Sequence, residues 1–519
     1  MTFFEKFEKL PAIISWTFLL GPFIFIKFYP EAVAIFFIIF TLFWLLQGLS
    51  YSYFLLRSYI VYKKQEAQDW EQIQNNVRTV PHIDTYLYQY TNQAELSQIS
   101  KKNINDVTHI VIIATYKEPY EILHDTMLAL QQSRTNKEKI FIIFALEQRD
   151  EENAMKNIAQ LKLHFLPTLP NIFYALHPKD TPGEIVGKGS NITFAAKTLI
   201  PNLISTYKIN QDLAIVTTLD ADNIVHPDYF SVLTYTFLRT PQNQRQLFSY
   251  QPLPFLYNNY WKVPIFVRLV AISSTFWHLI ESSRRDRLRN FSAHAQPLSS
   301  LIKIDYWSKI TIVEDGHQFW RSYTHFKGNY GVIPLYIPIY QDAVEKEKYW
   351  QTLKAQYIQL RRWAHGAEDV GYLSQKLFQK NSTLPFWKTL LYLIRLIQCH
   401  VMWATAPVLL MFSTQIFSIF SPSFATSPIF YNFDHILKIY FSVAVIGIVI
   451  SIWMSFLLLP KPPREETLYK RILLWASIIL QWFLLPITTI ILSSIPAIEA
   501  QTRILFGKKV AFVVTEKRR

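Results

Sequence analysis

The chain has 519 residues, of which 50% are hydrophobic and 17% are charged. This length accommodates a soluble domain together with a membrane region, and the single cysteine, Cys399, excludes an intrachain disulfide. The net charge of +14 at pH 7 predicts an anionic partner, which could be anionic lipid, a polyphosphate-bearing substrate or nucleic acid.

Two long apolar runs open the chain. Residues 10–30 and 31–56 are each long enough to cross a hydrocarbon core, which takes about 20 helical residues. A cleaved signal peptide fits less well, because the second apolar run follows at once and no small-residue cleavage site is evident. Basic residues from Arg57 onward follow the second run, so the positive-inside rule places the next segment in the cytoplasm. We therefore expect residues 1–60 to form a two-helix transmembrane hairpin that breaks at Pro30.

The next part of the chain, residues 61–340, reads as a soluble α/β domain. Short runs rich in Ile, Val and Phe suit parallel strands buried on both faces, and they occur at residues 109–116, 139–147, 171–177 and 212–220. The segments between them, such as residues 119–133, show helical periodicity. This βαβ succession predicts a Rossmann-like, mostly parallel sheet, whose ligands bind at the carboxyl ends of the strands.

Apolar character returns in residues 386–500, in about three segments at 387–420, 435–460 and 471–497. The loop after the first segment lacks Lys and Arg and is expected outside, whereas the loop after the second is basic and is expected inside. A full span by the third segment would carry the basic tail, residues 501–519, to the outside. Pro486 divides this segment, so we expect a re-entrant or interfacial piece there and a cytoplasmic tail.

Asp220 and Asp222 follow the last predicted strand, in a D-x-D pattern. Mg²⁺ or Mn²⁺ typically takes one or two carboxylates together with phosphate oxygens of a substrate. An acidic turn is the simpler interpretation of this pattern alone. The Gly-rich stretch around Lys188 favours a phosphate ligand, because glycines allow close backbone approach and a lysine supplies a positive charge; an ordinary Gly-rich turn is the alternative.

Further carboxylates follow other apolar runs. Glu147 ends a predicted strand, where it could bind a ribose or a base or could simply be solvated. Glu314 and Asp315 form a second acidic pair. Transfer of a sugar from a nucleotide diphosphate needs one base to deprotonate the acceptor hydroxyl, while a metal stabilises the diphosphate that leaves. A D-x-D pair and one separate carboxylate therefore suffice for an inverting transferase.

Residues 341–385 are expected to form amphipathic helices at the membrane surface. Within them the periodicity of residues 347–366 predicts a helix, on which Gln359, Arg362 and Trp363 share one face. An apolar stripe among lysines and arginines suits a helix that lies on a membrane. The alternative is that Trp363 belongs to a protein core and the arginines are solvated.

Taken in order, these motifs resemble those of the membrane-embedded family 2 glycosyltransferases, the group of the cellulose, chitin and hyaluronan synthases. The matching elements are Glu147, Asp220 with Asp222, "QPLPFLYN" from Gln251 to Asn258, "VED" from Val313 to Asp315, and "QLRRW" from Gln359 to Trp363. Glu147 stands where the family has an aspartate, and Val313 where it has a threonine. The resemblance implies a GT-A type domain between N-terminal and C-terminal transmembrane helices.

By this resemblance Asp220 would contact the donor nucleotide, and Asp222 with Asp220 would hold Mg²⁺ or Mn²⁺. Asp315 would be the general base, with Glu314 beside it in the catalytic pair. The other residues that the resemblance places in donor binding are Glu147, Lys188, Gln359, Arg362 and Trp363. Those it places on the acceptor side are Gln251, Asn258 and Trp363.

The sequence thus predicts an inverting, metal-dependent hexosyltransferase of the cytoplasmic membrane, with its catalytic domain in the cytoplasm. Its expected partners are a nucleotide-diphosphate sugar, with UDP as the leading nucleotide, a growing glycan and membrane lipid. Single-sugar transfer to a polyprenyl phosphate or another lipid is a second interpretation, and a non-catalytic membrane scaffold is a third. We do not expect a nucleic-acid partner, because many basic residues lie beside predicted spans, where membrane orientation accounts for them.

Overall fold

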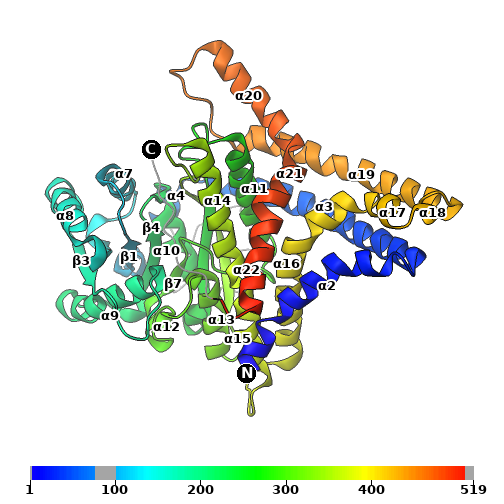
Figure 1. The fold of residues 1–519 in the computed structure, drawn as a ribbon. Coiled ribbons are helices and arrows are strands. Elements are labelled where there is room, and N and C mark those ends of the chain that lie inside the picture. The colour runs from blue at the N-terminus through cyan, green and yellow to red at the C-terminus, as the bar shows by residue number, and fades with distance from the viewer. Residues whose placement is uncertain (1–2, 76–100, 509–519) are drawn as a thin grey trace. The chain divides into compact units, whose positions relative to one another are not determined.

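The structure, a computed structural model, describes residues 3–75 and 101–508 (Figure 1). Most of the basic tail, residues 509–519, therefore lies outside the described residues. The chain divides into two compact units. Among the described residues the first unit contains residues 3–56, 261–273 and 347–508, and the second contains residues 57–75, 101–260 and 274–346.

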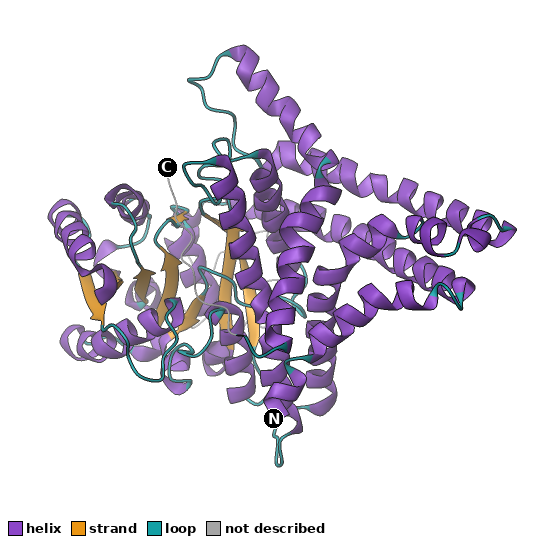
Figure 2. Ribbon diagram, in the orientation of Figure 1, coloured by secondary structure: helices purple, strands orange, loops and turns teal. Residues whose placement is uncertain are grey.

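The second unit is built on one mixed eight-stranded sheet, with the strand order β3-β2-β1-β4-β7-β6-β8-β5. Figure 2 shows the strands in orange, with helices around them. Its strands are β1 (Thr108–Ala114), β2 (Ile140–Glu147), β3 (Ile172–His177), β4 (Ala214–Asp220), β5 (Ile224–Val225), β6 (Phe248–Phe255), β7 (Ala295–Pro297) and β8 (Gly331–Tyr340). The four predicted strands are confirmed as β1 to β4, and they pair in parallel. In the other half of the sheet only β6 and β8 pair in parallel. The short strand β7 runs antiparallel to both β4 and β6, so the sheet is mixed.

The helices of the second unit include α4 (Trp70–Asn75), α6 (Lys101–Asp106), α7 (Tyr120–Gln131), α8 (Glu151–Phe165), α9 (Lys188–Tyr207), α10 (Tyr229–Arg239), α12 (Leu298–Lys303) and α13 (Glu314–His325). Of these, α7, α8, α9, α10 and α12 pack on strands of the sheet. On one face Ile110, Ile112 and Ile143 pack with Ala195 and Ala196 of α9, and all five are fully buried. Burial of each isoleucine stabilises the fold by about 1.5–3 kcal/mol. This packing fixes where α9 begins, and therefore where its first side chains lie.

The first unit is helical. It contains α1 (Phe3–Phe7), α2 (Leu10–Phe25), α14 (Tyr349–Ala364), α15 (Asp369–Phe378), α16 (Phe386–Phe412), α17 (Gln415–Phe420), α18 (Pro422–Ala425), α19 (Pro428–Leu458), α20 (Leu468–Phe483), α21 (Leu485–Thr489), a π-helical turn (Ile490–Ser494) and α22 (Ile495–Leu505). Two more helices, α3 (Pro30–Glu66) and α11 (Ile265–Ser282), contribute residues to both units. One core cluster of the first unit contains Phe37, Phe417 and Phe433.

Five helices in the described residues are long and apolar enough to cross a membrane, which supports membrane association. They are Phe4–Phe25, Pro30–Glu66, Ile265–Ser282, Phe386–Phe412 and Pro428–Leu458. The sequence did not lead us to expect the third, which has 56% of its most apolar window buried inside the protein. The predicted division at Pro486 is confirmed, because the helix breaks between Phe483 and Leu485 and bends by 62°.

Candidate functional site

Asp220 ends β4 at the carboxyl edge of the parallel half of the sheet. β4 lies between the parallel strand β1 and the antiparallel strand β7, so it marks the change of pairing within the sheet. A tight turn follows: the Asp220 backbone N–H donates to Asn223 Oδ1 at 3.0 Å, and the Asn223 N–H donates to the Asp220 carbonyl at 3.1 Å. Ligands of α/β sheets bind at such edges.

Two side-chain donors contact the Asp220 carboxylate. Lys188 Nζ lies 2.6 Å from Asp220 Oδ1, and the Ser292 hydroxyl donates to Oδ2 at 2.5 Å. Lys188 is the first residue of α9, and the side chain of Asp220 remains 29% exposed. The predicted proximity of Asp220 and Lys188 is thus present in the structure, whereas Ser292 had no signal in the sequence.

Lys188 also faces the second predicted acidic pair. Its Nζ lies 3.9 Å from Glu314 Oε1, and its side chain is only 12% exposed. Burial would lower the pKa of this ammonium, but the charges of Asp220, Glu314 and Asp315 outweigh burial and raise the pKa above its ordinary value. Lys188 therefore stays charged, and it joins the end of β4 to the start of α13.

Gly189 allows this arrangement. A Cβ at this position would lie 2.3 Å from the Ser308 carbonyl and 3.0 Å from the Glu314 Cβ, so no larger residue fits without displacement. The close approach brings the start of α9 against the start of α13. Glu314 and Asp315 occupy the first turn of α13, where the helix dipole favours negative charge.

Asp315, the predicted base, is half-buried. Its Oδ1 accepts the backbone N–H of Gly316 at 2.8 Å. The negative charge of Asp315 contributes to the raised pKa of Lys188. Asp315 thus belongs to the same electrostatic cluster as Asp220 and Glu314.

Asp222 differs from Asp220 in exposure, since it is fully buried. Its Oδ2 accepts the backbone N–H of Asp342 at 2.8 Å. The Asn258 amide donates to the Asp222 carbonyl at 3.2 Å and to Asp342 Oδ1 at 2.8 Å. Asn258, which the resemblance places on the acceptor side, therefore ties the turn after β4 to the end of β8.

Gln251 supports the same region from β6. Its Oε1 accepts the Phe291 N–H at 2.8 Å, and its amide donates to the Ser292 carbonyl at 3.3 Å. Gln341 donates to the Ser292 hydroxyl at 3.3 Å. Gln251 is buried, so it fixes the backbone of the segment that presents Ser292 to Asp220.

Glu147 lies at the end of β2 in a separate charged cluster. Its Oε2 is 2.9 Å from Arg149 Nη2 and 3.6 Å from His177 Nδ1. His177 Nε2 is 3.0 Å from Glu184, which in turn pairs with Lys309 at 2.8 Å. Burial would lower the pKa of His177, but the two carboxylates outweigh burial and raise it.

Gln359, Arg362 and Trp363 are on α14, in the first unit, so the predicted helix is confirmed. Gln359 is buried and accepts a hydrogen bond from the Gln356 amide at 3.0 Å, while Arg362 and Trp363 are half-buried. The neighbouring Arg361 pairs with Glu499 of α22 at 2.7 Å.

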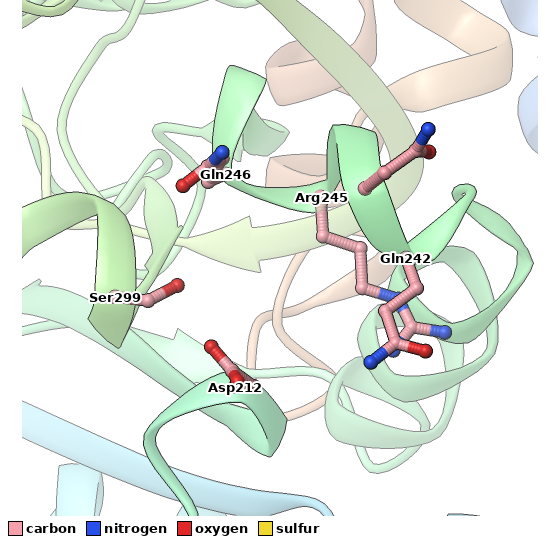
Figure 3. A pocket seen from close by; sticks show the side chains of 6 residues that line it. Asp212, Gln242, Arg245, Gln246 and Ser299 are labelled. Atoms are coloured by element: carbon pink, nitrogen blue, oxygen red, sulfur yellow. The ribbon is translucent and has the colours of Figure 1, made fainter.

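A polar pocket of about 460 Å³ lies at the opposite end of β4 (Figure 3). Its lining residues are Asp212, Gln242, Asn243, Arg245, Gln246 and Ser299. Asp212 precedes β4 and Asp220 ends it, and the strand between them, Ala214–Asp220, spans roughly 20 Å at about 3.3 Å per residue. The Arg245 guanidinium donates to backbone carbonyls at the end of α10. This pocket is therefore distinct from the candidate site.

The donor set around Asp220 suits a hard cation. In the described part of the chain, no group of three or more His, Cys, Asp or Glu side chains could hold a metal ion. Asp220 and Asp222 offer only oxygen ligands, which Mg²⁺ and Mn²⁺ prefer. Mg²⁺ usually binds through one or two carboxylates plus phosphates of the substrate. The residues present thus fit a cation that binds together with a phosphate-bearing ligand.

No protein-family model and no curated protein sequence matches the chain. Among solved structures it is similar to a mannosyltransferase from Pyrobaculum calidifontis in complex with GDP-Man and Mn²⁺, at 13% identity and a TM-score of 0.44, over 92% of this chain and 99% of that one. It is also similar to S. aureus TarS with UDP-GlcNAc, at 10% identity and a TM-score of 0.33, over 78% and 93% of the two chains. It is similar as well to GalNAc-T7 with UDP, GalNAc and Mn²⁺, at 12% identity and a TM-score of 0.30, over 57% of this chain and 58% of that one. Each of these three TM-scores is below 0.5.

Proposed function

We propose that the chain is an inverting, divalent-metal-dependent glycosyltransferase with a GT-A type domain, acting at the cytoplasmic membrane. It would transfer a sugar from a nucleotide diphosphate, with UDP as the leading candidate, to a growing glycan. The observation that supports this most is the position of Lys188, a half-buried ammonium between Asp220 and Glu314 at the carboxyl edge of the sheet. A positive charge flanked by carboxylates suits a diphosphate that binds with a cation.

In this proposal Asp220 and Asp222 hold Mg²⁺ or Mn²⁺ and orient the donor. The cation, when bound, stabilises the negative charge that develops on the leaving diphosphate. Lys188 binds the donor phosphates, for which its retained positive charge is suited. Glu147 and the α14 residues Gln359, Arg362 and Trp363 are proposed donor ligands by the family resemblance.

Asp315 is the proposed general base. It accepts the proton of the acceptor hydroxyl as that oxygen forms a bond to the anomeric carbon. The bond from the anomeric carbon to the diphosphate oxygen breaks in the same step, and the nucleoside diphosphate leaves. One displacement inverts the anomeric configuration. Gln251 and Asn258 would act indirectly, because they hold the loops around Asp220 and Asp222.

The test is turnover by the full-length protein in lipid. Purified protein with Mn²⁺ is supplied separately with UDP-glucose, UDP-N-acetylglucosamine, UDP-galactose and GDP-mannose, and release of UDP or GDP is measured. We expect turnover of one of these donors and its loss with EDTA. A radiolabelled donor then gives a ladder or polymer for glycan extension, and one discrete lipid-linked product for single-sugar transfer. Failure to turn over any nucleotide sugar would contradict the proposal and favour a non-catalytic scaffold.

A further inference from the structure

Asp220 is a proposed cation ligand and also the partner of the Lys188 ammonium, and these two roles compete. As a proposed cation ligand it must offer a carboxylate oxygen, but its Oδ1 is 2.6 Å from Lys188 Nζ and its Oδ2 accepts the Ser292 hydroxyl at 2.5 Å. Asp222 is fully buried and its Oδ2 accepts the Asp342 N–H. The more exposed carboxylate of the pair, that of Asp220, is thus the one that already has a cationic partner.

The conflict between a cation on Asp220 and the Lys188 ammonium is electrostatic. Mn²⁺ or Mg²⁺ binds a carboxylate oxygen at about 2.1 Å, so a cation on Asp220 Oδ1 would lie at most about 4.7 Å from Lys188 Nζ as it stands. Two positive groups this close, one of them divalent, repel strongly in a partly buried site. Lys188 has little freedom to avoid the cation, because its side chain is 12% exposed and Glu314 lies on its other side.

We propose that Lys188 excludes the divalent cation from Asp220 until the diphosphate of the donor is present. This inference rests on the proposed binding of the donor and the metal at this site, and it adds the order in which the two bind. The diphosphate competes with Asp220 for the ammonium and supplies the oxygens that the two carboxylates lack. Nucleotide and cation therefore bind with positive coupling, each raising the affinity for the other by the same factor.

The test measures Mn²⁺ binding, independently of catalysis. Purified full-length protein is titrated with Mn²⁺ alone and with UDP, free Mn²⁺ is followed by electron paramagnetic resonance, and Mn²⁺–UDP association in solution is subtracted. We expect UDP to tighten Mn²⁺ binding to the wild type at least about tenfold. Equal Mn²⁺ affinity with and without UDP would overturn the inference, even if no variant could be prepared.

Variants locate the effect. Lys188→Met should tighten binding of Mn²⁺ alone by about tenfold or more, while it weakens binding of UDP alone. A loss of folding would weaken both ligands, so opposite shifts separate exclusion from damage. Adding Asp220→Asn to Lys188→Met should remove the gain, and a gain that persists would overturn the assignment to Asp220.

Two controls separate charge from position. Lys188→Arg keeps the positive charge and should bind Mn²⁺ alone as weakly as the wild type. Lys309→Met removes a lysine that pairs with Glu184 and should leave Mn²⁺ binding unchanged. If Lys309→Met tightens Mn²⁺ binding as much as Lys188→Met does, the inference is wrong.

The two proposals fail in different ways. A wild-type protein that binds Mn²⁺ tightly only with UDP, but turns over no nucleotide sugar, supports the exclusion by Lys188 and contradicts the proposed transfer. An active protein that binds Mn²⁺ equally well without UDP retains the proposed function and loses this inference.

Discussion

At the scale of single residues, the candidate site is a cluster in which one ammonium balances three carboxylates. Lys188 contacts Asp220 and Glu314, and Asp315 adds to the negative field around it. Because the three carboxylates interact with the same ammonium, removing the charge of one carboxylate affects the electrostatic environment of the other two. Substitutions that keep the shape and remove only the charge therefore give the clearest information on each role.

Asp315→Asn tests the proposed base. The amide retains the shape and an oxygen that can accept the Gly316 N–H, but it cannot take a proton from the acceptor hydroxyl. We expect donor turnover to fall by about 10²-fold or more, with UDP affinity within about threefold of the wild type. Turnover and calorimetric UDP binding are measured on the same preparation. Near wild-type turnover in this variant would show that Asp315 is not the base.

His177 gives a pH-dependent prediction. Its pKa is raised in the folded protein by Glu147 and Glu184, against the effect of burial. The charged imidazole thus stabilises the fold fully below the unfolded pKa of about 6.5, and this contribution is lost as pH rises through the higher folded value. The apparent thermal midpoint of the wild type should fall between about pH 6 and pH 8.

The comparison is with His177→Gln, which is neutral over this range. Its midpoint should lie below that of the wild type at pH 6, and the difference should shrink by pH 8. The same fall in both proteins would assign the pH dependence to other groups.

At the scale of elements, the site depends on how closely the starts of α9 and α13 approach. Gly189→Ala places a methyl 2.3 Å from the Ser308 carbonyl, so one helix must shift. Overpacking of this kind destabilises by about 1–3 kcal/mol, and we expect the free energy of unfolding to fall by that amount. Gly316→Ala in α13 is the matched control, since a Cβ there meets no atom within 4 Å. Equal losses in the two variants would refute the close-contact argument.

The elements also show what the sequence can and cannot predict. Strands β1 to β4 were predictable because each is a run of Ile, Val, Phe and Ala flanked by polar segments. Strands β6 and β8 were not, since prolines interrupt both: Pro252 and Pro254 in β6, and Pro334 and Pro338 in β8. The hydrogen bond from Ser292 to Asp220 joins residues 72 positions apart, and no local pattern encodes such a contact. The motifs thus predicted that Asp220 and Lys188 lie close together, while the contacts that support Asp220 required the fold.

At the scale of the whole molecule, the open question is on which side of the membrane each loop lies. Charge predicts that the loop after α17 is outside and the loop between α19 and α20 is inside. The side on which the C-terminal tail lies depends on the helix pair that bends by 62° near Pro486. If this pair enters the membrane and returns to the cytoplasmic side, the tail stays in the cytoplasm. One full crossing would move the tail to the other side.

A single-cysteine map answers this question, because Cys399 is the only cysteine of the chain. In a Cys399→Ser background, Ser423→Cys, Glu465→Cys and Lys508→Cys each place one thiol at an exposed position. In intact cells a membrane-impermeant thiol reagent should label position 423, and should reach 465 and 508 only after permeabilisation. Labelling of 508 in intact cells would show that α20 to α22 cross the membrane completely. Labelling of 465 in intact cells would show that the orientation is the reverse of the predicted one. Asp315, the pair Asp220 and Asp222, and Lys188 would then lie on the side away from the nucleotide sugars of the cytoplasm.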